Sequence, residues 1–144
     1  MNALRAVALR TLLGSGGLLL VLSLMIWIGA GGPAIVAVHV ALGVVLVLSL
    51  WILAAIAARS GTSVSPVAFA VFWGFLVLAF GLAQQRILPG QWHWTVQLTH
   101  LFVSMGAIWW GRRLLGIMRR GQISPTPSPV PNRLASSPAM DKEG

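Results

Sequence analysis

The sequence predicts an all-α integral membrane protein, a four-helix up-and-down bundle with a disordered C-terminal tail. Of its 144 residues, 57% are hydrophobic and only 8% are charged, whereas an average soluble domain carries about 25% charged residues. The apolar residues gather in four runs, each of the roughly 20 residues that a helix needs to cross the hydrocarbon core. Such runs must be helical, because backbone groups that face lipid find no water to bond. We expect one transmembrane domain, over residues 1–120.

Short breaks rich in glycine, proline and arginine separate the four runs. The runs cover about residues 11–31, 34–58, 66–86 and 92–111. Pro66 favours the first turn of the third helix, where its missing N–H would have no intrahelical acceptor. The first run follows Arg5 and Arg10, so a secretory signal peptide is the alternative interpretation. Its length exceeds the about 7–15 apolar residues of a usual signal peptide, and we expect it to be retained.

The arginines around the four runs predict the orientation of the bundle. Seven of them fall on one side: Arg5, Arg10, Arg59, Arg112, Arg113, Arg119 and Arg120. Only Arg86 falls on the other side. Since Lys and Arg gather on the cytoplasmic side, both termini are predicted to be cytoplasmic, in a bacterial inner membrane. The formal charge of +8 therefore indicates a membrane topology, and we expect no nucleic-acid partner.

Residues 121–144 differ in composition from the rest of the chain. They hold five of the eight prolines, together with serines and both acidic residues. A segment of this kind buries too little apolar area to offset its ordering entropy. We expect a disordered cytoplasmic tail; a strand that docks on a neighbouring subunit is the alternative.

Acidic residues and cysteines are missing from the predicted helices. The first acidic residue is Asp141, and the chain has no cysteine. Carboxylate proton relays, hard-cation sites and thiolate metal sites are therefore excluded from the membrane region. Histidines are the ionisable groups that remain inside the runs.

Two of the three histidines are predicted to lie at similar depth on diagonal helices. His39 lies roughly 8 Å below the outer surface and His100 roughly 12 Å below it, at 1.5 Å per residue. Diagonal helices of a bundle leave room for two inward imidazoles with one metal between them. Helical spacing also puts four polar residues of the last run on one face: His93, Gln97, His100 and Ser104. A histidine hydrogen-bonded to a carbonyl or serine is the alternative for His39, and an interfacial residue is the alternative for His93.

Small residues accompany the two histidines. Gly43 follows His39 by four residues, and Gly81 shares a face of the third run with Gly74. Such positions would let a flat macrocycle approach the backbone, although they also serve helix packing. Two imidazoles without a thiolate or carboxylate suit a six-coordinate haem b. Zinc would require three or four ligands, and copper is an alternative if His93 joins the pair.

The outer polar residues complete the expected cofactor site. The haem propionates would emerge near Arg86, His93 and Gln97, where polar or positive groups would meet them. Arg86 is the only outer arginine, so it is expected to act on the propionates by charge.

Three short motifs resemble known haem proteins of membranes. The motifs are Val38-His39-Val40-Ala41-Leu42-Gly43, Gly81-Leu82-Ala83-Gln84 and Gln97-Leu98-Thr99-His100-Leu101. They resemble one four-helix half of the haem A synthase family, and the layout is similar to small cytochromes of the b561 kind. The resemblance implies that His39 and His100 ligate haem. The family's outer cysteine pair and its glutamate beside a ligand histidine are missing, so no haem-modifying activity is expected.

The expected function is that of a membrane b-type cytochrome, an electron-transfer subunit of a larger complex rather than a stand-alone enzyme. One haem does not carry an electron across roughly 30 Å of hydrocarbon, so a second redox centre or a quinone is the expected partner. The alternatives are a haem-free accessory or assembly subunit and a pigment-binding subunit.

Overall fold

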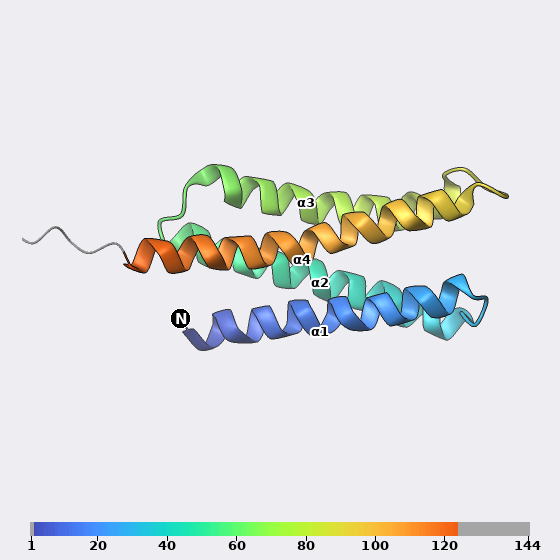
Figure 1. Cartoon of the computed structure of the whole chain (residues 1–144), viewed down its shortest axis with the longest axis horizontal. Helices are drawn as coiled ribbons and strands as arrows, with labels where there is room; N and C mark the ends of the chain where they lie inside the picture. Colours follow the sequence, from blue (N-terminus) through green and yellow to red (C-terminus); the bar gives the residue numbers. More distant parts are fainter. Residues whose placement is uncertain (1, 124–144) are drawn as a thin grey trace, which may run out of the picture.

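The computed structural model describes residues 2–123, which form four long helices and a single short 3-10 turn, without strands. The elements are α1 (Asn2–Trp27), α2 (Pro33–Arg59), α3 (Val64–Ala83), η1 (Gln84–Arg86) and α4 (His93–Ile123). Successive helices run antiparallel (Figure 1), so the predicted up-and-down bundle is confirmed. The expected tail lies, from residue 124 onward, outside the described residues.

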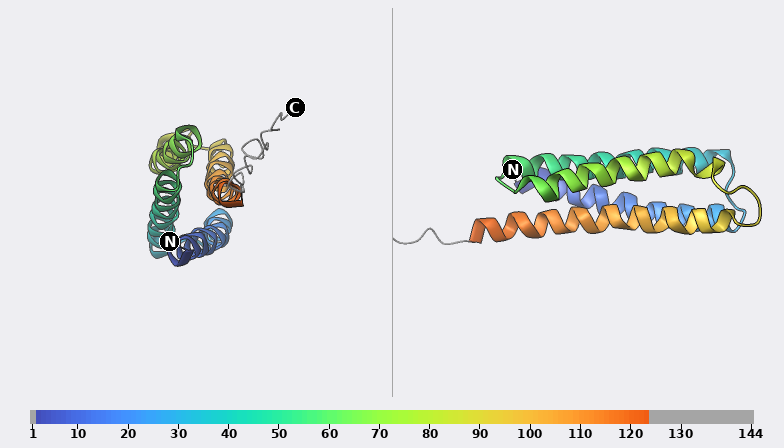
Figure 2. Two further views of the ribbon diagram at one scale, coloured as in Figure 1. Left: turned by 90° about the vertical axis from the view of Figure 1, so that its left-hand side faces the viewer. Right: turned by 90° about the horizontal axis from the view of Figure 1, so that it is seen from above.

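Three of the helices are long and apolar enough to cross a membrane. These segments are Ala3–Trp27, Pro33–Arg59 and Val64–Ala83. α4 is longer than any of them, but its polar stripe and its arginines lower its mean hydropathy. It lies alongside the other helices over their length (Figure 2). By length and composition, the protein belongs in a lipid bilayer.

Two helices extend beyond the expected spans. α1 begins earlier, at Asn2, and α4 ends later, at Ile123. In the extension of α4, Leu114 and Met118 lie four residues apart and are both buried. Residues at this spacing share one helix face, and this face packs into the bundle. Arg112 and Arg113 precede these two positions and Arg119 and Arg120 follow them, so α4 continues through both arginine pairs.

The four helices form a ring in chain order, seen end-on in Figure 2. α2 and α4 touch across the centre of this ring, whereas α1 and α3 make no contact within the described part of the chain. Gly111 of α4 packs closely against Leu12 of α1, where a Cβ would clash, and a Cβ there would be in ordinary contact with Leu53 of α2 at 3.4 Å. α2 and α4 are therefore the short diagonal of the bundle.

The packed core occupies one half of the bundle. The buried residues of α2 all belong to its C-terminal half: Leu46, Val47, Ser49, Leu50, Leu53, Ala54, Ile56 and Ala57. No residue of the N-terminal half of α2, residues 33–45, is buried within the described structure. The open half is the end that carries the α1–α2 and α3–α4 loops (Figure 1). His39 and His100 lie in this half.

Two indole groups attach α3 to its neighbours. Trp73 donates its Nε1–H to the Val103 carbonyl of α4 at 2.9 Å, and Trp51 of α2 donates to the Val71 carbonyl at 3.1 Å. Gly106 leaves the space that the Trp73 ring occupies. These bonds hold α3 in a defined rotation, and so they decide which of its residues face His100.

Candidate functional site

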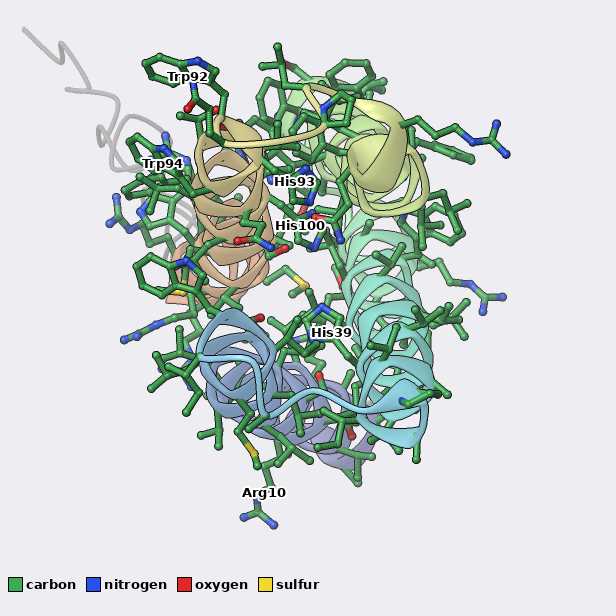
Figure 3. All side chains as sticks on the ribbon, turned by 90° about the vertical axis from the view of Figure 1, so that its right-hand side faces the viewer. Arg10, His39, Trp92, His93, Trp94 and His100 are labelled. Atoms are coloured by element: carbon green, nitrogen blue, oxygen red, sulfur yellow. The ribbon has the colours of Figure 1, made fainter. Side chains whose placement is uncertain are left out.

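His39 and His100 face each other across the short diagonal of the bundle. Their ring centroids are 6.3 Å apart and their planes are tilted by 51°. Figure 3, which looks onto the loop end, shows both side chains directed into the space between the helices. Both side chains are partly buried. Two residues that are 61 positions apart in the sequence thus form one pair.

The spacing of the two rings matches that of two ligands on one metal. When two imidazoles bind one metal from opposite sides, each metal–nitrogen bond is about 2.0–2.1 Å long. Adding the distance from nitrogen to centroid within each ring places the two centroids roughly 6 Å apart. The structure contains no hydrogen bond between these two described rings, because they are too far apart for a direct N–H···N contact. An ordered water that bridges the rings is the other small group of suitable size.

The ring nitrogens of the pair lack protein partners. Nδ1 of His39 and Nδ1 of His100 are both buried without a hydrogen-bond partner among the described residues. A buried polar atom without a partner costs free energy. Such atoms call for a specific explanation, and an absent ion, water or cofactor is the usual one.

α3 shapes the environment of His100. Phe80 stacks on the imidazole with the ring planes only 7° apart and the centroids 5.9 Å apart. A Cβ at Gly81 would lie 3.2 Å from Cε1 of His100. Gly43 has a different setting, since a Cβ there would meet nothing within 4 Å. Gly81 therefore provides close contact with a histidine, whereas Gly43 provides open space.

Two cavities adjoin the pair of histidines and share both of them as lining residues. The smaller, of about 150 Å³, reaches toward the bundle centre past Gly43 and Ser104. The larger, of about 600 Å³, lies between α1 and α4 on the side of the loops and includes Trp27 in its wall. Cofactor pockets commonly measure about 300–1,000 Å³, so the larger cavity is of cofactor size.

The polar stripe of α4 faces these cavities along its whole length. His93 and Gln97 line the larger cavity, Ser104 lines the smaller, and His100 lines both. Figure 3 shows His93 above His100 on the same side of the helix. Nδ1 of His93 is 3.4 Å from the Ile87 carbonyl oxygen, which is a long contact. His93 thus lies at the outer edge of the site, beside the α3–α4 loop.

Two further polar residues line both cavities, although the sequence analysis assigned neither of them to the site. They are Ser23 of α1 and Gln84 of η1. Ser23 follows the buried residues Ser15 and Leu19 at helical spacing, and Gln84 follows Gly81 by three residues. Helical spacing from these inward-facing residues was the sequence signal that could have placed Ser23 and Gln84 at the site. Arg86, which was expected at the site, is exposed and is not among the residues that line either cavity.

The geometry of this site is the basis for its assignment, since comparisons with known proteins add nothing to it. The chain matches no protein-family model, no curated protein and no solved structure. The resemblance to haem A synthases and b561 cytochromes stays a prediction.

The donor set restricts what the site can hold. No group of three or more His, Cys, Asp or Glu side chains suited to a metal ion occurs within residues 2–123. A bare zinc ion would have two protein ligands instead of the three or four that it requires. A metal that already carries equatorial ligands needs only two axial ones, and two imidazoles can supply them. The residues present therefore fit a metal macrocycle better than a free ion.

Proposed function

We propose that this protein is a membrane b-type cytochrome, which binds haem b between His39 and His100 and transfers electrons as a subunit of a larger membrane complex. The observation that carries the proposal is the 6.3 Å spacing of the two imidazoles across the short diagonal. The cavity of about 600 Å³ beside them provides additional support.

Each group of residues has a separate role in this proposal. His39 and His100 would hold the haem through one imidazole nitrogen each, and Phe80 and Gly81 orient the ring of His100. Haem b supplies one-electron redox chemistry when it is bound. With both imidazoles engaged in holding the group, the site would suit electron transfer rather than oxygen binding.

Neutral polar groups are the proposed contacts of the propionates. Ser23, Gln84, His93 and Gln97 line the larger cavity at or near the loop end. Hydroxyl, amide and imidazole N–H groups can donate hydrogen bonds to a carboxylate. Arg86 is exposed outside the cavity, so it acts on this site only through its charge at a distance.

A redox partner is part of the proposal, because the histidine pair lies in one half of the bundle. A single centre there does not span roughly 30 Å of hydrocarbon. A second redox centre in a neighbouring subunit, or a quinone in the bilayer, would receive or supply the electron. The arginine distribution supports a bacterial inner membrane with both termini in the cytoplasm.

An absorption spectrum of the purified protein tests the proposal. We expect a low-spin b-type spectrum, with a Soret band that shifts on dithionite reduction. His39→Ala and His100→Ala should each remove at least about nine-tenths of the bound haem, because each loses one of the two axial bonds. His93→Ala is the matched control and should retain the haem.

Three outcomes would contradict the proposal. Full haem content in His100→Ala would overturn the ligand assignment. A purified protein with no Soret band, even after reconstitution with haem, would favour a haem-free accessory subunit. Absorption typical of a chlorophyll-like pigment would favour a pigment-binding subunit.

A further inference from the structure

Arg5 is buried at the end of the bundle opposite the loops of the histidine site. It is only 9% exposed, and its Nη2 donates to Oγ of Ser60 at 2.7 Å. The Ser60 hydroxyl in turn donates to the Ile56 carbonyl, so its oxygen is oriented to accept from Arg5. Nε of Arg5 is buried without an acceptor among the described residues. A guanidinium is thus held in place with most of its donors unused.

No protein carboxylate in the described structure balances this charge. Residues 2–123 contain no Asp or Glu. Further arginines lie in the C-terminal parts of α2 and α4, which end on this side of the bundle: Arg59, Arg112, Arg113, Arg119 and Arg120. A buried charge without a counter-ion is costly, and neighbouring charges of the same sign add to the cost. The site therefore calls for an anion from outside the helical domain.

We propose that Arg5 and Ser60 form a binding site for the phosphate of an anionic phospholipid headgroup. A guanidinium presents paired N–H donors that match two phosphate oxygens. Leu4 and Val7, on either side of Arg5 in α1, are exposed apolar residues that acyl chains can cover. These apolar neighbours favour a lipid over free phosphate, and the cytoplasmic leaflet is rich in anionic lipids. The inference does not depend on haem binding.

Lipid binding to the full-length protein in an uncharged detergent, followed by native mass spectrometry, tests the proposal. The probes are phosphatidylglycerol and phosphatidylcholine with identical acyl chains. Arg5→Gln should weaken phosphatidylglycerol binding about tenfold or more, because a charge-assisted hydrogen bond is lost. Arg10→Gln is the matched control, since it removes one charge from the same helix and Arg10 is exposed and points away from the bundle (Figure 3). It should change binding less than about threefold.

If circular dichroism shows that Arg5→Gln does not fold, two further variants test the proposal. Arg5→Lys keeps the charge and loses the paired donors, so an intermediate loss of binding supports the site. Ser60→Ala removes the acceptor that positions Arg5, and a weaker preference for phosphatidylglycerol supports the same conclusion. Unchanged binding in both of these variants would overturn the proposal.

Other results would also overturn it. Equal losses of phosphatidylglycerol binding in Arg5→Gln and Arg10→Gln would show that the net positive charge attracts the lipid and that no specific site holds it. Inorganic phosphate that displaces phosphatidylglycerol at equal concentration would make free phosphate the ligand. Two results together would make the carboxylates of this chain the occupant of the site. Arg5→Gln alone would leave phosphatidylglycerol binding unchanged, and the full chain with Asp141→Asn and Glu143→Gln would bind phosphatidylglycerol more tightly.

Discussion

Gly81 of α3 lies directly against the imidazole of His100 on α4. A Cβ at position 81 would be 3.2 Å from Cε1 and 3.9 Å from Nε2 of that ring. Phe80, the preceding residue, stacks on the same imidazole. α3 thus orients the histidine although it supplies no candidate ligand of its own. Residues that orient a metal ligand commonly affect the affinity for the metal.

Gly81→Val should displace the His100 ring and lower the haem content of the purified protein by about half or more, since outer-shell changes commonly cost 10- to 100-fold in affinity. The ratio of haem to protein, together with the low-spin spectrum, measures the effect. Gly17→Val is the control, because Gly17 is exposed and a Cβ there meets nothing within 4 Å. An unchanged haem content in Gly81→Val would show that α3 does not orient the ligand.

Gly106→Ala should destabilise the bundle. The new Cβ would lie 2.7 Å from Nε1 of Trp73, the atom that donates to the Val103 carbonyl. Overpacking of this kind costs about 1–3 kcal/mol, and the strained hydrogen bond adds to the loss. Thermal unfolding in detergent, followed by circular dichroism, measures it.

Gly116→Ala provides the control of opposite sign for the same helix. A Cβ there meets nothing within 4 Å, so the better helix propensity of alanine should raise stability by up to about 1 kcal/mol. An unfolding temperature of Gly106→Ala equal to or above that of the unmodified protein would show that the packing of Trp73 against Gly106 does not limit stability.

Arg86→Gln should lower the midpoint potential of the bound haem slightly. Loss of a positive charge stabilises the more positive ferric form, so reduction becomes less favourable. One charge about 10 Å away in water is worth roughly 0.4 kcal/mol, on the order of 20 mV for a one-electron couple. The shift should fall further at high salt, because Arg86 is exposed. A redox titration at two ionic strengths checks both effects, and a large shift at high salt would place Arg86 at the propionates.

Reporter fusions should locate the two ends of the bundle on opposite sides of the membrane. Fusions after Gly61 and after Gly144 are expected to read cytoplasmic, and a fusion after Gly90 to read external, because the arginines concentrate at the Gly61 end. Gly61 lies in the α2–α3 loop and Gly90 in the α3–α4 loop, at opposite ends of the structure. A cytoplasmic signal at Gly90 would invert the proposed orientation and place the histidine pair near the other leaflet.

The number and order of the helices were predictable because both depend on local properties of the chain. Pro33 and Arg59 bound α2 almost where the apolar run ends, since a proline and a charge interrupt such a run wherever they occur. The true ends of α1 and α4 were not predictable in this way. Leu114 and Met118 of the α4 extension are buried in the same core cluster as residues of the other helices, and this tertiary burial is not visible in the local sequence.

The sequence by itself determined which residues share a face: helical periodicity predicted that His93, Gln97, His100 and Ser104 would line up, and all four border the cavities. Periodicity carries no information on the distance between faces of different helices. The short distance between His39 and His100 depends on how closely the helix axes pack and on how each helix is rotated about its axis. The positions of Ser23 and Gln84 beside the pair depend on the same two properties. Side chains far from the site decide both, among them Gly111 against Leu12 and the Trp73 indole bonded across to α4. Tertiary packing therefore turned two histidines on separate helices into one pair.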